Sequence, residues 1–125
     1  MSFREIRSIL KTIILIQLDF IERMKVLGYP RLISMDSFRT PNFELVADIL
    51  YWLVRRYDPS SDLLDNISTE QHRVDFLQNA AQIMGSKAQI KLKTAQLYRA
   101  DGFAVRELLK IADVLFQSLR LVAIV

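Results

Sequence analysis

His72 is the only histidine in a chain of 125 residues that contains no cysteine. A Ser-His-Asp triad would depend on this one residue, and a metal site built from histidine or cysteine ligands has too few of them. His72 stands next to Arg73 in the first turn of an expected helix, where an exposed histidine without a catalytic role is the common case. The sequence therefore predicts neither enzymatic activity nor a bound metal ion.

Glycine-rich loops that hold phosphate groups are also absent from the sequence. Gly28, Gly85 and Gly102 stand far apart, whereas a P-loop or a dinucleotide-binding loop needs several glycines within one short turn. The methionines at helical spacing are expected to fill the core. We therefore expect no cofactor.

The charged residues that could form a binding site gather in the last third of the chain. The basic ones are Lys87, Lys91, Lys93, Arg99, Arg106 and Lys110, with Tyr98 among them and Asp101 and Glu107 close by. These basic residues have two open interpretations: a solvated surface, or a face that contacts an acidic protein such as the tubulin tail. The positive charge is too sparse to favour nucleic acid, so no nucleic-acid partner is expected.

Length and composition bound the scaffold that must position these residues. A chain of 125 residues, 51% hydrophobic and 25% charged, with a net charge of +3, can close one core, so we expect a single domain over residues 1–125. The absence of cysteine fits a reducing compartment, with the cytoplasm as the expected location. The apolar stretch 12–18 is too short to span a bilayer and has no cleavage pattern, so we expect no membrane insertion.

Apolar residues recur at helical spacing along most of the chain, and no segment shows the alternation of a strand. A long first helix is expected over residues 3–27, since the first glycine and proline appear in Gly28-Tyr29-Pro30. Its inward positions are expected to be Ile6, Leu10, Ile13, Phe20, Met24 and Leu27.

A second helix is expected to begin with Thr40 as N-cap and Pro41 in the first turn, and to run through Tyr57. Its polar residues fall on one narrow stripe, so the rest of its surface is apolar. A helix of this kind is expected at the centre of the core.

Two further helices and a short one are expected in the second half of the chain. Ser68 and Gln71 have the spacing of a capping box and predict a helix whose inward face is Val74, Leu77, Ala81 and Met84, flanked by Phe76, Ala80 and Ile83. Leu97 and Tyr98 belong to a short helix or turn. Asp101-Gly102 is expected to cap a final helix with apolar positions Val105, Leu108, Leu109, Ala112, Leu115, Phe116 and Leu119.

Blocks of residues spread over nearly the whole chain resemble one known family. They are Met1-Ser-Phe-Arg-Glu-Ile-Arg7, Leu27-Gly-Tyr-Pro-Arg31, Ile33-Ser-Met35, Phe38-Arg-Thr-Pro-Asn-Phe43, Trp52-Leu-Val-Arg-Arg-Tyr57, Thr69-Glu-Gln71, Lys87-Ala88, Ile90-Lys-Leu92, Leu97-Tyr98, Ala100-Asp-Gly102 and Glu107-Leu-Leu-Lys-Ile111. On these blocks the chain resembles the N-terminal domain of the clusterin-associated protein family, whose members are subunits of the intraflagellar transport B complex. The Gly-Tyr-Pro and Phe-Arg-Thr-Pro-Asn-Phe blocks are the most specific.

The resemblance implies an all-α, calponin-homology-like helical globule with a long N-terminal helix, a central buried helix and a C-terminal helix. It also implies a non-enzymatic adaptor that docks onto a β-propeller subunit of the same complex. Its role would be in cilium assembly, in the cytoplasm, the cilium and the ciliary base. The alternative, known from related folds, is direct binding of tubulin or microtubules through a basic face.

Two features depart from the family pattern. Segment 8–18 looks inserted, and an insertion of about eleven residues is close to three helical turns, so it is expected to lengthen the first helix and expose Ile14, Leu15 and Ile16. The family continues into a coiled coil, whereas this sequence ends in the apolar tail 121–125 without sustained heptads. We therefore expect either a fragment or a shortened isoform.

Overall fold

The computed structural model describes the backbone of residues 1–124 and the side chains of residues 1–119. Within this part of the chain every regular element is a helix, and there is no strand. The elements are α1 (Phe3–Leu27), the 3-10 helix η1 (Met35–Phe38), α2 (Phe43–Tyr57), α3 (Glu70–Ala88), α4 (Thr94–Arg99) and α5 (Gly102–Ile124). The expected all-α class is confirmed. The side chains of the apolar tail 121–125 lie outside the described residues.

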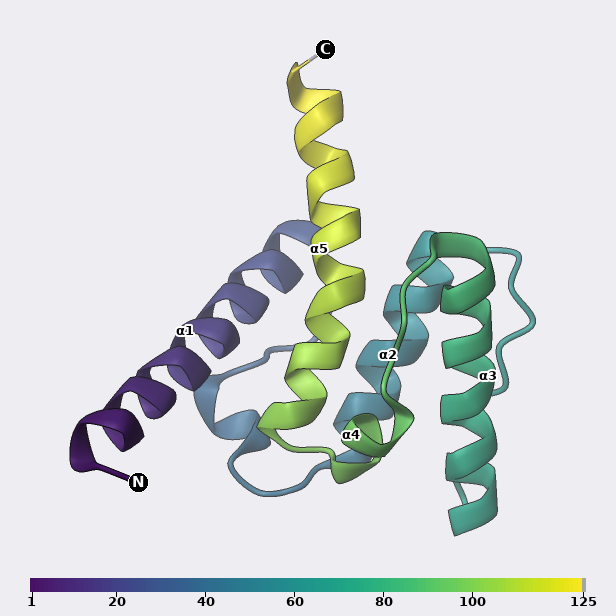
Figure 1. Ribbon diagram of the computed structural model, residues 1–125. Coiled ribbons are helices and arrows are strands. Elements are labelled where there is room, and N and C mark those ends of the chain that lie inside the picture. Colours follow the sequence, from purple (N-terminus) through teal and green to yellow (C-terminus); the bar gives the residue numbers. More distant parts are fainter. Residues whose placement is uncertain (125) are drawn as a thin grey trace.

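Helix α5 runs through the middle of the molecule and separates the other helices into two groups (Figure 1). The carboxyl half of α1 packs on one side of α5, and α2 and α4 pack on the other, with α3 beyond them. The amino half of α1 leads away from this body, so the N-terminus lies far from the helices that form the core (Figure 1).

Helix α2 occupies the centre of the core, as its apolar surface predicts. Seven of its fifteen residues are buried, and Val46, Ile49, Leu50, Leu53 and Val54 are fully so. The polar residues of its narrow stripe, Glu44, Asp48 and Arg55, are exposed. A helix that is apolar over most of its circumference must bury that surface against several neighbours at once, and α2 contacts α3, α4 and α5.

Only half of α1 takes part in the core. Gly28 ends the helix in the left-handed conformation at φ 88°, and Phe20, Met24 and Leu27 are buried as expected. The expectation for the amino half is wrong, since Ile6, Leu10 and Ile13 are 42%, 55% and 38% exposed. Helical spacing shows which residues share a face, but not how far along that face a neighbouring element extends.

The projecting half of α1 largely matches the exposure expected for segment 8–18. Ile14 and Leu15 are 49% and 55% exposed. Ile16, however, is half-buried and packs against the edge of the core, so its expected exposure is wrong. Ile16 faces the side of α1 that meets α5, whereas Ile14 and Leu15 lie on other sides of the helix.

The starts of α2 and α3 differ from the sequence-based expectation by one or two residues. Asn42, not Thr40, caps α2, and its side-chain oxygen accepts a hydrogen bond from the Leu45 backbone N–H at 3.2 Å. The Asn42 backbone N–H donates to the Ala100 carbonyl at 2.9 Å, a long-range bond that holds it outside the helix. Thr69, not Ser68, caps α3 through the His72 backbone N–H at 3.1 Å.

The buried faces of α3 and α5 are rotated slightly from the expected ones. In α3, Phe76 and Ala80 are fully buried with Leu77 and Met84, while the expected Val74 and Ala81 are half-buried. In α5 the most buried positions are Ala104, Val105, Leu108, Ile111 and Ala112, whereas the expected Leu119 is 44% exposed. Leu119 belongs to the carboxyl-terminal part of α5, which extends beyond the neighbouring helices (Figure 1).

Candidate partner-binding surfaces

Lys87, the first of the predicted basic residues, serves to join two helices. Its ammonium group donates a hydrogen bond to the Asp58 carboxylate at the end of α2, and the Tyr57 hydroxyl donates to the Lys87 backbone carbonyl at 3.2 Å. The hydrogen bond from Lys87 lowers the pKa of Asp58, and the same bond raises the pKa of Lys87. Lys87 therefore holds the end of α3 against the end of α2.

We expect Lys87→Met to weaken the dependence of stability on acid pH. The lowered pKa of Asp58 means that its carboxylate stabilises the fold above its unfolded pKa of about 3.9, and that this contribution disappears as the pH falls through the lower folded pKa. The urea midpoint should thus fall less in Lys87→Met than in the original protein between about pH 5 and about pH 2. Lys25→Met, which removes a longer and more exposed pair with Glu22, is the control and should keep the original profile. Equal profiles for both variants would contradict the prediction.

Lys110 and Glu107 join α5 to the segment between α3 and α4. The Glu107 side chain is only 6% exposed, and one of its carboxylate oxygens accepts hydrogen bonds from the Lys93 backbone N–H and from Lys110 Nζ, each at 2.7 Å. Lys110 Nζ also donates to the Lys91 backbone carbonyl at 2.9 Å. The Lys110 charge is thus compensated within the protein.

Arg99 is engaged locally at the end of α4. Its Nε lies 3.3 Å from Asp101 Oδ2, and its guanidinium stacks over the Phe103 ring at 4.0 Å from the ring centre. The same Asp101 side chain caps α5, because its other oxygen accepts from the Phe103 backbone N–H at 3.0 Å. Arg99 therefore takes part in the corner between α4 and α5.

The six predicted basic residues do not form one continuous face. Lys93, Arg106 and Lys110 line a shallow depression of about 450 Å³ together with Ile16 of α1. Lys87 belongs to the last turn of α3, and this end of α3 lies far from α4 (Figure 1), the helix that ends at Arg99. Among the described side chains, Lys91, Lys93 and Arg106 have no acidic partner within ion-pair distance.

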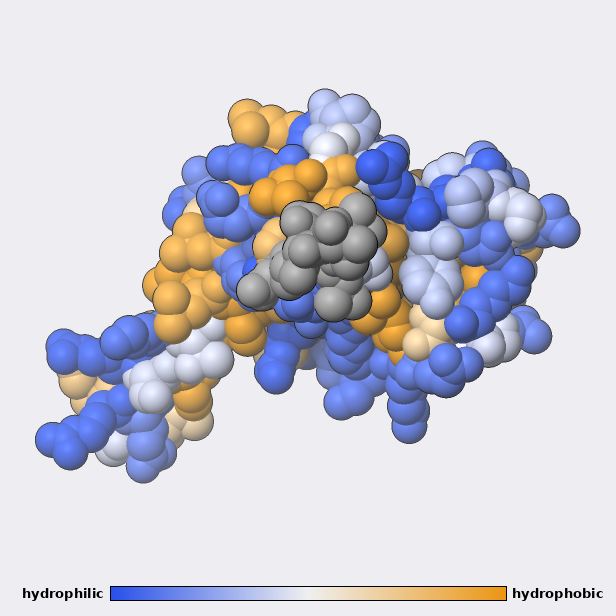
Figure 2. All heavy atoms as spheres, turned by 90° about the horizontal axis from the view of Figure 1, so that it is seen from above, coloured by the Kyte–Doolittle hydropathy of each residue, from blue (hydrophilic) through white to orange (hydrophobic). Residues whose placement is uncertain are grey.

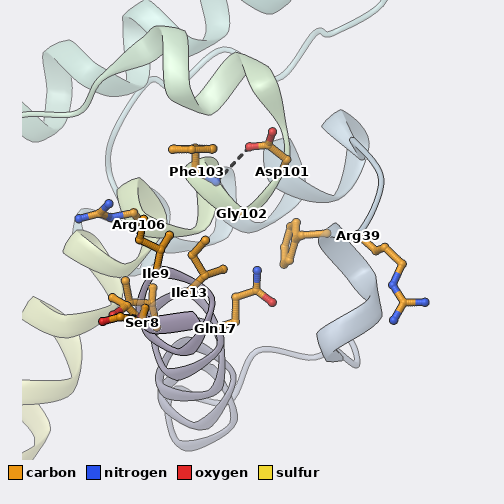
Figure 3. Close-up of a pocket in the computed structure, with 12 residues that line it drawn as sticks. Ser8, Ile9, Ile13, Gln17, Arg39, Asp101, Gly102, Phe103 and Arg106 are labelled. Atoms are coloured by element: carbon orange, nitrogen blue, oxygen red, sulfur yellow. Dashed lines mark hydrogen bonds between the residues drawn. The ribbon is translucent and has the colours of Figure 1, made fainter. Parts of the chain in front are cut away.

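A larger apolar groove lies between the projecting half of α1 and the body of the protein. Its volume is about 520 Å³, and its walls come from α1, from η1 and from the first turn of α5. In Figure 3, Ile9 and Ile13 of α1 face Phe103 and Arg106 of α5, and the Arg39 side chain points outward at the other end. Sequence analysis did not find this groove, because its walls are distant in the sequence; the only signal was the apolar character of segment 8–18.

The groove is closed at its inner end where α1 approaches α5. A Cβ atom on Gly102 would lie only 3.1 Å from Nε2 of Gln17, so the missing side chain allows the two helices to come this close. Ser8 and Thr12 add hydroxyl groups to the α1 wall. The groove is therefore apolar along its length, with polar groups at its margins.

His72 is exposed at the start of α3, as the sequence predicts. Its Nδ1 lies 3.1 Å from the Ser68 hydroxyl and 2.9 Å from the Thr69 hydroxyl, both of which belong to the helix cap. In the described part of the chain, no three acidic, histidine or cysteine side chains are grouped so that they could hold a metal ion. None of the described helices combines the length and the apolar character needed to cross a membrane.

Comparison with known proteins places most of this chain in one group. A model of the clusterin-associated protein-1 family matches residues 25–122. Clusterin-associated protein 1 of Mus musculus is 52% identical over 120 residues, which are 96% of this chain and 26% of the mouse protein. The Homo sapiens protein is 51% identical and the Danio rerio homolog 48%, with the same coverage. The chain thus spans about a quarter of the length of these relatives.

Proposed function

The chain belongs to the clusterin-associated protein-1 family, and from this membership we propose that it is a non-enzymatic adaptor of the intraflagellar transport B complex. Its helical domain docks onto a β-propeller subunit of that complex and acts in cilium assembly. It resides in the cytoplasm, the cilium and the ciliary base. The observation that supports this proposal is the family match over most of the chain.

The blocks that carry the family resemblance have structural roles at the junction of α1 and α2. Tyr29 is buried, its hydroxyl donates to the Asp48 carboxylate, and its ring meets the edge of Trp52 with 5.3 Å between ring centres. Burial and Asp48 both raise the pKa of Tyr29. The Arg56 guanidinium lies 5.4 Å from the centre of the Trp52 ring. These contacts hold the segment after α1 against α2.

Direct tubulin binding is the alternative, and the charges of this structure give it less support. A tubulin tail is a flexible acidic peptide and needs several uncompensated cations close together. Lys87, Arg99 and Lys110 each have an acidic partner within this chain. Lys91, Lys93 and Arg106 are the cations that favour the tubulin alternative.

Two binding measurements made in parallel separate the proposals. We expect this chain and the β-propeller subunit to elute from a sizing column as one stoichiometric complex. The complex should persist between about 0.05 and about 0.3 M NaCl, because an interface that buries apolar surface is screened little by salt. In the same range of NaCl concentration, the chain should stay in the supernatant when microtubules are pelleted.

Lys91→Ala combined with Lys93→Ala provides the control for the tubulin alternative. Both side chains are exposed, so the double variant should fold normally. Microtubule pelleting that falls with salt and is lost in the double variant, together with no propeller complex, would contradict the adaptor proposal. It would support tubulin binding through Lys91 and Lys93.

A further inference from the structure

The apolar residues of α1 follow a coiled-coil spacing along the whole helix. Steps of three and four residues alternate through Phe3, Ile6, Leu10, Ile13, Gln17, Phe20, Met24 and Leu27, and Gln17 is the one polar residue in this row. The last three of these positions are buried in the core. The first four continue the same line beyond the body of the protein, and we call them the α1 seam.

Most of the α1 seam is left uncovered by the described part of the chain. Phe3, Ile6, Leu10 and Ile13 are 76%, 42%, 55% and 38% exposed. Ile9 and Ile14 lie on either side of the seam and are 46% and 49% exposed, so the apolar surface is wider than one row. In Figure 2 the hydrophobic atoms gather where α1 leaves the body, and hydrophilic atoms cover most of the projecting end in this view.

The shape of this surface fits a helix. The groove of about 520 Å³ runs beside the seam, between Ile9 and Ile13 on α1 and Phe103 on α5. A second helix laid along α1 would bury the seam and place one edge in this groove, as in helix-in-groove recognition. A β-propeller presents strands and loops, so such a helix would be a contact beyond the proposed propeller docking.

The charges beside the seam favour an acidic occupant. Arg4, Arg7 and Lys11 outnumber Glu5 on the projecting half of α1. Arg106 lines the same groove, and its guanidinium points outward at the edge of the groove, without an acidic partner among the described side chains (Figure 3). Asp101 also borders the groove, but its charge is offset by Arg99 at 3.3 Å.

A second copy of this chain is disfavoured by the same charges. Two α1 seams facing each other would place side by side two helix halves that each carry three cations, Arg4, Arg7 and Lys11, and one carboxylate, Glu5. Like charges across a helix pair oppose association, and opposite charges at the flanking positions select the partner.

We propose that the α1 seam and its groove bind an amphipathic helix of another protein, apolar on one face and acidic along its margins. The helix lies along α1 and buries Phe3, Ile6, Leu10 and Ile13. Its acidic residues pair with Arg7, Lys11 and Arg106.

Synthetic peptides of about three heptads provide the test. One carries leucine and isoleucine on its apolar face and glutamate at the flanking positions, and the other carries lysine in place of glutamate. Fluorescence anisotropy with labelled peptide should show binding of the glutamate peptide at least about tenfold tighter than of the lysine peptide. Ile9→Asp and Ile13→Asp should each lower the affinity for the glutamate peptide at least about tenfold, since each places a carboxylate in the apolar contact.

Leu32→Asp is the matched control, because Leu32 is 85% exposed and lies outside the groove. This variant should bind the glutamate peptide with the affinity of the original chain. Circular dichroism of all three variants checks that they remain folded. Equal affinity for both peptides, or unchanged affinity in Ile9→Asp and Ile13→Asp, would overturn the proposal.

Two further measurements test whether a second copy of this chain, or the β-propeller subunit, occupies the α1 seam instead. Sedimentation of the chain alone should show a monomer; a dimer that Ile13→Asp dissociates would identify a second copy as the occupant and overturn the proposal. Ile9→Asp and Ile13→Asp should still co-purify with the β-propeller subunit. If the variants lost binding of both the β-propeller subunit and the peptide, the seam would be the propeller site. That result would overturn the proposal of a separate helical partner.

Discussion

Phe20→Ala is expected to lower the free energy of unfolding by about 3–5 kcal/mol, a large share of the stability of a domain of this size. Phe20 is 1% exposed and lies on the part of α1 that packs against α5. Removing its ring loses the transfer free energy of the buried aromatic atoms and leaves a cavity that the surrounding helices fill only in part. Urea denaturation followed by circular dichroism measures the change.

Ile14→Ala is the matched variant on the same helix. Ile14 is 49% exposed on the projecting half, so its truncation removes little buried surface, and alanine has the higher helix propensity. Its unfolding free energy should stay within about 0.5–1 kcal/mol of the original. Equal losses in the two variants would contradict the division of α1 into a core half and a projecting half.

Glu107→Ala is expected to destabilise the protein by about 2–3 kcal/mol. The Glu107 carboxylate accepts from the Lys93 backbone N–H at 2.7 Å in a part-buried position, and alanine would leave that N–H without its acceptor. The Lys110 side chain is 39% exposed and can turn toward water, so its loss of a partner adds little. Urea denaturation gives the free energy, and amide hydrogen exchange reports the Lys93 N–H directly.

Glu107→Gln distinguishes the backbone hydrogen bond from the charge. Glutamine keeps an acceptor oxygen close to the Lys93 N–H but removes the negative charge, so we expect a loss of about 1 kcal/mol or less. Lys110→Met tests the ion pair from the other side and should also have a small effect. If glutamine destabilised as much as alanine, the charge and not the bond to Lys93 would hold this segment in place.

The positions of the helices could largely be predicted from sequence, because the signals that start and stop a helix are local. Gly28 ends α1 where it was expected to, and the apolar circumference of α2 placed that helix at the centre of the core. The errors at Thr40 and Ser68 are also instructive. Each stands within two residues of another good cap, and at the start of α2 the long-range bond from Asn42 N–H to the Ala100 carbonyl favours Asn42.

The candidate surfaces were less predictable, because their geometry depends on residues that are distant in sequence. The basic residues after residue 86 were identified by type, but nothing in the sequence showed that Lys87 pairs with Asp58, or that Lys110 pairs with a buried Glu107. The apolar groove was missed for the same reason, since η1, α1 and α5 contribute to it from separate parts of the chain. Only the exposure of segment 8–18 was foreseen.

By itself the sequence determined the helical class, the approximate bounds of each helix, the central place of α2 and the family. These properties depend on patterns within a few residues, or on motifs that remain recognisable without coordinates. The tertiary structure alone decided that Ile6, Leu10 and Ile13 lie outside the core, which cations are already paired and where a groove lies beside the α1 seam. Burial and pairing depend on which elements meet in space, and residues with the same periodicity, such as Ile13 and Phe20, differ only in whether a neighbouring helix reaches them.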